Sequence, residues 1–196
     1  MAETVVLNPM DWFRKQAEKE NKKNILKKSD RIGQIIGIVG VFVVLIFFGY
    51  HLSKPTGFFT STFGILGAIL FFGVNVVGIF PQAVRLLTGR KNPARPFDIL
   101  NSALFLVVLI YFVATFPFDF SHFAEPLPFS LEFLINWVSN SLASLLMVLG
   151  IIGLLIALPY QILLFKAIRE LPPELKEEPS GDAQPASAEA PSEEQK

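Results

Sequence analysis

The feature that most constrains this chain is the absence of charged side chains from three long apolar stretches. Residues 57–84 and 133–165 contain no Asp, Glu, Lys, Arg or His, and residues 32–53 contain only His51. An uncharged apolar stretch of about 18 residues or more is typical of a helix that crosses a membrane. A single soluble domain of 196 residues has no core that could bury several such stretches. We therefore predict that the chain folds in a bilayer.

The composition supports four membrane spans in an all-α fold. Hydrophobic residues make up 52% of the chain and charged residues 17%, against roughly 25% charged residues in soluble domains. The apolar segments predict a polytopic transmembrane helical bundle, with a membrane domain over residues 32–168 and spans at about 32–52, 58–80, 97–116 and 142–165. The last apolar segment, taken as residues 131–168, would be roughly 57 Å long as one helix, whereas a bilayer core is about 30 Å thick. It is therefore expected to cross once, with residues 133–141 at the outer interface.

Basic residues mark the side of the membrane on which both termini are expected. Residues 1–31 carry eight Lys and Arg against five Asp and Glu. The connection after the second span holds four basic residues and no acid: Arg85, Arg90, Lys91 and Arg95. Lys166 and Arg169 follow the fourth span. Because basic residues concentrate in cytoplasmic loops, we expect cytoplasmic termini, by default in a prokaryotic plasma membrane and alternatively in an organelle membrane.

The two ends of the chain differ in charge and in expected order. Residues 1–31 form a cytoplasmic basic arm in which Asn8 followed by Pro9 marks a helix start. This short helix either rests on the cytoplasmic lipid surface or lies in solvent. The sequence favours the solvated arm because the apolar face is short and broken. Residues 169–196 form an acidic tail rich in Pro, Ala, Ser and Glu, which is expected to be disordered because it cannot bury enough apolar surface.

Small residues in the spans mark surfaces where helices can approach closely. The first and fourth spans carry five glycines suited to this role: Gly33, Gly37, Gly40, Gly150 and Gly153. Glycines four residues apart leave a shallow groove on one helix face. The favoured interpretation is packing of the four spans against one another, and the alternative is docking onto a helix of a partner.

The polar side chains within the spans are mainly amides and hydroxyls. The candidates for bonds between helices are Gln34, Asn75, Asn101, Asn140 and Ser144. No Asp, Glu, Lys or Arg is expected at mid-membrane, and Asp98, near Arg95, is interpreted as a carboxylate at the start of the third span. Since ion-driven transport usually needs an ionisable group at mid-membrane, this pattern argues against a proton-coupled carrier. It leaves a facilitator for neutral solutes open.

Two prolines lie near the cytoplasmic ends of alternate spans. Pro81 and Pro159 each lack the backbone N–H that a straight helix needs, so both are expected to kink their helices. The second helix is expected to continue past its proline towards residue 87. The pair Pro81-Gln82 before a basic connection resembles the Pro-Gln pair of the PQ-loop and SWEET sugar-carrier families. Those families use three-helix repeats, which a four-span chain does not reproduce, and the resemblance is confined to this dipeptide and its neighbours.

The connection between the third and fourth spans is rich in Phe and Pro. In residues 116–129 phenylalanines alternate with polar residues, and the prolines prevent a long helix or strand. We expect this segment to cover the outer ends of the spans with its rings facing the membrane. Four residues on this side are weak candidates for metal ligands: His51, Asp119, His122 and Glu125. Their spacing matches no known ligand motif, and neither a metal site nor another cofactor is predicted.

No catalytic motif is present in the sequence. It has no phosphate-binding glycine loop, no zinc-protease motif, no nucleophile elbow and no cysteine, so an enzyme is not expected. Nucleic-acid binding is not expected either, because the basic arm is interleaved with acids and joined to a membrane domain.

The expected partners are the lipid bilayer and either other membrane-protein subunits or further copies of the chain. The favoured function is an accessory, assembly or scaffold subunit of a membrane complex, and the alternative is a small oligomeric transporter or channel for a neutral solute.

Overall fold

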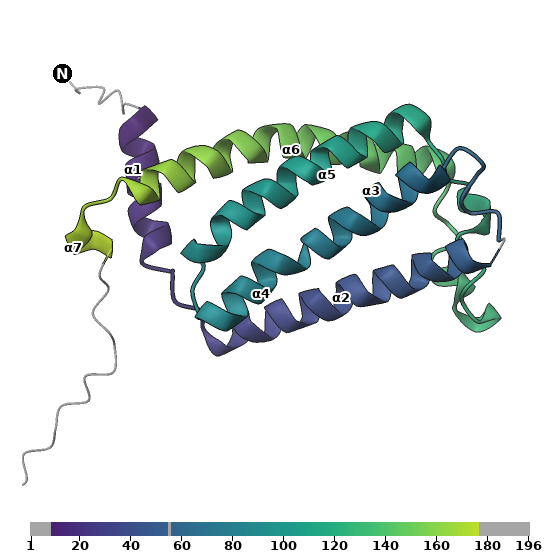
Figure 1. Ribbon diagram of the computed structural model, residues 1–196, viewed down its shortest axis with the longest axis horizontal. Coiled ribbons are helices and arrows are strands. Elements are labelled where there is room, and N and C mark those ends of the chain that lie inside the picture. The colour runs from purple at the N-terminus through teal and green to yellow at the C-terminus, as the bar shows by residue number, and fades with distance from the viewer. Residues whose placement is uncertain (1–8, 55, 177–196) are drawn as a thin grey trace, which may run out of the picture.

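The regular structure of the chain is helical. The computed structural model describes residues 9–54 and 56–176, and within them there are helices and short helical turns but no strand (Figure 1). The helices are α1 (Pro9–Asn21), α2 (Lys28–Ser53), α3 (Gly64–Val77), α4 (Ile79–Thr88), α5 (Arg95–Thr115), α6 (Asn140–Arg169) and α7 (Pro173–Lys176), and the 3-10 turns are η1 (Asn92–Ala94), η2 (Phe120–His122) and η3 (Phe129–Leu134). Four segments are long and apolar enough to cross a membrane, which confirms the all-α class and the number of candidate spans. The tail predicted to be disordered was residues 169–196, but residues 169–176 include the end of α6, the buried Leu171 and α7. Residues 177–196 lie outside the described residues.

The fourth span begins where a side chain can cap it. The Ser139 hydroxyl accepts a hydrogen bond from the Leu142 backbone N–H, which satisfies one of the free donors at the start of α6. The residues before it form η3 and a turn, so the helix begins at Asn140, close to the expected start at about residue 142. At 30 residues, α6 is about 45 Å long. This exceeds a bilayer core of about 30 Å, so the helix extends beyond the bilayer core.

The second span starts later than predicted. Its helix begins at Gly64, and residues 58–63 belong to the preceding connection. This stretch pairs with the connection after α5, because the Asp119 N–H donates to the Phe58 carbonyl over 2.7 Å and the Thr60 N–H donates to the Pro117 carbonyl over 3.1 Å. Within this stretch Phe58 and Phe63 are buried, whereas Ser61 and Thr62 are exposed. Hydropathy alone cannot distinguish buried rings of this kind from the start of a membrane span.

The second span is also divided by a break at Gly78, between α3 and α4. Pro81 has no N–H to bond the carbonyl four residues before it, so the regular ladder is interrupted at this point. The Gln82 side-chain amide donates to the Gly78 carbonyl over 3.2 Å, so this side chain adds a contact at the break. Pro159, in contrast, lies inside the continuous helix α6.

The spans are arranged as a row. In Figure 1, α2 lies beside the broken helix α3–α4, α5 follows, and α6 forms the opposite edge. The helix α1 crosses the end of α6. We name the end of the row with α1 and residues 89–95 the basic end, and the end with residues 54–63 and 116–139 the aromatic end.

Residues 9–21 are not a solvated arm, which corrects the favoured interpretation of this segment. Ala17 of α1 is fully buried against a cluster on the end of α6 and the residues after it, formed by Leu164, Ile168 and Leu171. The Phe13 ring also lies 6.1 Å from the ring of Tyr160, between centroids. The apolar face of α1 is short, but it is long enough for this packing because it covers only the end of α6.

Candidate functional site

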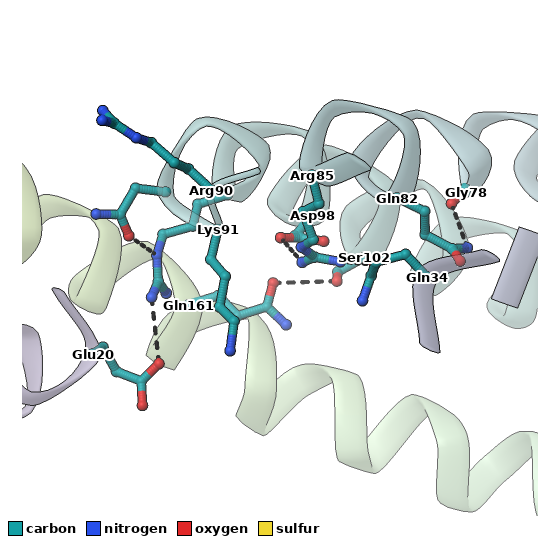
Figure 2. A network of polar contacts seen from close by, with 12 residues as sticks. Glu20, Gln34, Gly78, Gln82, Arg85, Arg90, Lys91, Asp98, Ser102 and Gln161 are labelled. Atoms are coloured by element: carbon teal, nitrogen blue, oxygen red, sulfur yellow. Dashed lines mark hydrogen bonds and ion pairs between the residues drawn. The ribbon is translucent and has the colours of Figure 1, made fainter. Parts of the chain in front are cut away.

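Each of the four spans contributes a polar side chain to a set of contacts near the basic end (Figure 2). Arg85 of α4 forms an ion pair of 2.5 Å with Asp98 of α5 and donates to the Gln34 side chain of α2 over 3.3 Å. One turn beyond Asp98 on α5, the Ser102 hydroxyl donates to the Gln161 side chain of α6 over 3.3 Å. We name these five residues the polar belt, because together they link neighbouring spans across the whole row.

The acid at the start of the third span therefore has a more specific position than the sequence indicated. Asp98 faces Arg85 across the α4–α5 connection rather than serving only its own helix start. Arg85 was counted with the basic connection, although the helix was expected to continue towards residue 87. The helix α4 extends to Thr88 and includes Arg85. A sequence signal existed: two opposite charges flank a short connection between consecutive helices. Ser102 and Gln161 carried no comparable signal, because their contact depends on the register of two distant spans.

The basic connection is neutralised by acids from other elements. Lys91 pairs with Asp30 of α2 at 3.2 Å. Arg95 pairs with Glu20 of α1 at 3.4 Å, and its Nε donates to the Asn92 side chain over 3.0 Å. The four-residue basic cluster in the sequence is therefore partly compensated in space, and it joins α1, α2 and α5 at the basic end.

Two cavities lie on either side of the Arg85–Asp98 pair. The first, which we name the inner cavity, has a volume of about 300 Å³ and is lined by Arg85, Arg95, Asp98, Ile99, Asn101, Ser102 and Gln161. The second has a volume of about 430 Å³ and shares Arg85, Arg95 and Asp98 with the first. The Asn101 side-chain oxygen is buried and has no hydrogen-bond partner among the described residues. A buried carbonyl of this kind lacks the hydrogen bond that it would make with water, which costs free energy.

The aromatic end has a different chemistry. The rings of Phe58, Phe63, Phe112 and Phe118 are buried in one cluster with Val74 and Val108. An apolar cavity of about 160 Å³ lies beside these rings. Asn75 also lines this cavity, and its amide donates to the Phe71 carbonyl of its own helix over 2.7 Å. The predicted cover over the spans is thus built from both connections of this end.

The four weak metal candidates do not form one site in the structure. His51 is buried, with Nδ1 2.7 Å from the Thr56 hydroxyl and its ring 4.7 Å from that of Phe58 between centroids. His122 contacts Glu125 at 2.6 Å. Within the described part of the chain, no three His, Asp or Glu side chains are grouped as metal ligands.

Asp119 is held by local hydrogen bonds instead. Its side chain accepts bonds from the backbone N–H and the hydroxyl of Ser121, at 3.0 and 2.8 Å. Because these bonds favour the charged form, they lower the pKa of Asp119 below its ordinary value.

The remaining predicted residues occupy separate places. A side chain at Gly37 would collide with the Gln82 amide, and one at Gly150 would lie 3.1 Å from Leu109, so both glycines allow close contacts within the row. Side-chain carbons built at Gly33, Gly40 and Gly153 would meet no atom within 4 Å. The Asn140 side chain accepts a bond from the Phe120 N–H over 2.7 Å, and Ser144 is half-buried on α6.

Comparisons with known protein families, with curated proteins and with solved structures find no match for this chain. The polar belt, the inner cavity and the open edges of the row are the features that bear on function.

Proposed function

We propose that this protein is a non-catalytic subunit of a larger membrane complex, with an accessory, assembly or scaffold role, and that both termini lie in the cytoplasm. The observation that carries the proposal is the open row of spans. None of the residues in the most apolar 18-residue window of α2 is buried inside the protein. A row encloses no path across a membrane, and it leaves the flank of an edge helix available to another protein.

The small residues of α2 support this role. Gly33 and Gly40 are seven residues apart, so they lie on nearly the same face of the helix. Both are open, whereas Gly37 between them is already occupied by Gln82. Glycines on a helix face let a second transmembrane helix approach closely enough for van der Waals packing and weak hydrogen bonds. The edge helix thus has a surface suited to a partner helix beside its contact with α4.

The polar belt supports a scaffold because it fixes the relative positions of the spans. Interhelical hydrogen bonds in membranes are worth about 0.6 kcal/mol each on average, so the belt is a set of modest restraints shared by four helices. A partner docking on α2 would then meet a row of defined geometry.

Affinity purification from native membranes in a mild detergent tests the proposal. The wild-type chain is expected to retain other membrane subunits, identified by mass spectrometry, and Gly40→Leu is expected to lose them. Gly153→Leu is the matched control, because Gly153 is equally open but lies on the opposite edge helix α6. Gly37→Leu is unsuitable, since its side chain would displace Gln82. Recovery of the wild-type chain without any other subunit would contradict the proposal.

A small oligomeric transporter for a neutral solute is the second candidate. Two cavities favour it. The polar inner cavity near the basic end is lined by Asn101, and the apolar cavity at the aromatic end is lined by Asn75. A second copy would have to complete the path. Uptake of uncharged solutes into liposomes containing the purified chain tests this alternative, and loss of uptake in Asn101→Leu is the expected result.

A further inference from the structure

We infer that the inner cavity binds the phosphate of a membrane phospholipid whose head group also carries a hydrogen-bond donor. The inference goes beyond the proposed subunit role and does not depend on it. It rests on three properties of the cavity: its arginines, its depth along α5 and the unpartnered oxygen of Asn101.

The charge of the cavity suits an anionic group. Its lining contains two guanidinium groups, Arg85 and Arg95, and one carboxylate, Asp98. A guanidinium group has five N–H donors arranged to bind phosphate through two bonds at once. Arg85 donates to Asp98 and Gln34, and the Arg95 contact with Glu20 is long at 3.4 Å. Both guanidinium groups therefore have donors left for a phosphate.

The depth of the cavity suits a lipid. Arg95 is the first residue of α5, and Asn101 follows six residues later, about 9 Å along the helix axis. The polar head-group layer of a bilayer extends roughly 5–8 Å beyond the hydrocarbon core on each side. With the basic end at the membrane surface, the two arginines lie at the level of lipid phosphates. Because the spans form an open row, a lipid can reach this level sideways from the bilayer.

The unpartnered oxygen of Asn101 predicts which head groups are preferred. Asn101 lines the cavity, and its oxygen, which has almost no accessible surface, has to turn towards the ligand. Because a buried carbonyl without a partner is costly, a ligand that then donates a hydrogen bond to it gains affinity. Phosphatidylglycerol offers hydroxyl groups and phosphatidylethanolamine offers an ammonium group, whereas the head group of phosphatidylcholine has no N–H or O–H donor. The cavity is therefore expected to select among phospholipids that share the same phosphate.

A lipid is favoured over a soluble phosphate because of effective concentration. Arg85 and Arg95 already have protein partners, so a ligand must compete for them. The acyl chains of a lipid hold its phosphate beside the cavity and make this competition effectively intramolecular. A free phosphate ion has no such advantage.

Native mass spectrometry of the delipidated full-length protein tests the site, with phosphatidylglycerol, phosphatidylethanolamine, phosphatidylcholine and inorganic phosphate as separate probes. The wild-type protein is expected to bind the first two lipids about tenfold more tightly than phosphatidylcholine, as one buried hydrogen bond would give. Asn101→Leu is expected to abolish this preference. Arg95→Gln is expected to weaken binding of all three lipids about tenfold, whereas Arg90→Gln, an equal change of charge on an exposed residue outside the cavity, leaves binding unchanged.

A third variant separates binding from folding. Asp98→Asn removes the carboxylate that competes for Arg85, so it is expected to tighten phosphatidylglycerol binding several-fold, an effect that partial unfolding cannot produce. Equal binding of the three lipids by the wild-type protein would overturn the inference, whether or not every variant folds. So would weaker phosphatidylglycerol binding by Asp98→Asn, equal effects of Arg90→Gln and Arg95→Gln, or displacement of bound lipid by millimolar inorganic phosphate.

Discussion

The basic end and the aromatic end of the row are held together by different interactions. At the basic end, ion pairs and amide bonds join helices, as between Arg85 and Asp98 and between Lys91 and Asp30. At the aromatic end, phenylalanine rings from two connections pack around His51 and the ends of the spans. The two largest fully buried side chains of the described residues, Phe58 and Pro117, lie in these connections rather than in a span.

This difference follows from the solvent at each level of the molecule. Within lipid, apolar side chains gain little by contacting another helix, because the surrounding chains are equally apolar. Polar contacts and close packing therefore hold the spans. The connections leave the hydrocarbon layer, so burial of their rings away from water is favourable there. Directional bonds therefore dominate between the spans at the basic end, where α1 adds a small apolar cluster with α6, and burial of rings dominates at the aromatic end.

The largest expected effect is at the aromatic end. Phe58 is 1% exposed and its ring lies within 5.6 Å of those of Phe118, Phe120 and Phe123, between centroids. Phe58→Ala should lower the free energy of unfolding by about 3–5 kcal/mol, because it leaves a cavity in a packed cluster. Thermal unfolding in detergent measures the change. Phe129→Ala is the control, since Phe129 is 89% exposed, and an equal loss in the two variants would contradict the contrast between the ends.

A smaller loss is expected when the ion pair of the basic end is broken. Arg85→Met leaves Asp98 without its partner, and we expect a loss of about 2 kcal/mol, below the roughly 3–5 kcal/mol of a fully buried pair because both side chains are partly exposed. The double variant Arg85→Met with Asp98→Leu should recover most of the loss, since no unpaired charge remains. Denaturation of Arg85→Met, Asp98→Leu and the double variant in the same detergent measures both steps. Additive losses in the double variant would show that the pair does not act as a unit.

The sequence was sufficient for the features that depend on local composition. The three apolar stretches and the apolar segment at residues 97–116 located the four candidate spans, and the excess length of residues 131–168 predicted that this segment would not cross as one helix. Pro9 marked the start of α1, and Pro81 marked the region in which the second helix divides. Each of these features is decided within a few turns of chain, where hydropathy and proline chemistry act directly.

The predictions that were wrong or missing concern contacts between residues that are far apart in the sequence. Residues 58–63 read as part of a span because burial between connections and burial in lipid require the same apolar side chains. The packing of α1 required the projecting end of α6, about 150 residues away, and the Ser102–Gln161 bond required the register of two helices. A single sequence carries no local record of such pairings, so the inner cavity could not be predicted even though Asn101 was singled out.

At the basic end, Asn21 joins segments that are distant in sequence. It is 4% exposed, its amide donates to the Leu175 carbonyl over 2.6 Å, and its carbonyl accepts from the Asn92 side chain over 2.8 Å. Asn21→Ala should cost about 1–2 kcal/mol, because the Leu175 carbonyl and the Asn92 amide, both partly buried, lose their partner. Faster hydrogen exchange in residues 173–176 measures the release of α7. Lys22→Ala, at the exposed neighbouring residue, should leave that exchange unchanged, and an equal effect of the two variants would refute the bridging role.

The smallest expected effect adds an electrostatic component to the aromatic end. The hydrogen bonds from Ser121 lower the pKa of Asp119, so this carboxylate stabilises the fold at pH values above its ordinary pKa of about 3.9 and loses that contribution as the pH falls through the lowered value. A carboxyl carbon titration followed by NMR should give a midpoint below that of a free aspartate. Ser121→Ala should move the midpoint upward, because it removes the hydroxyl donor and leaves only the backbone N–H. A midpoint at or above the ordinary value in the wild-type protein would contradict this prediction. The Asp119 carboxylate would then add no electrostatic stabilisation, and ring packing alone would hold the aromatic end.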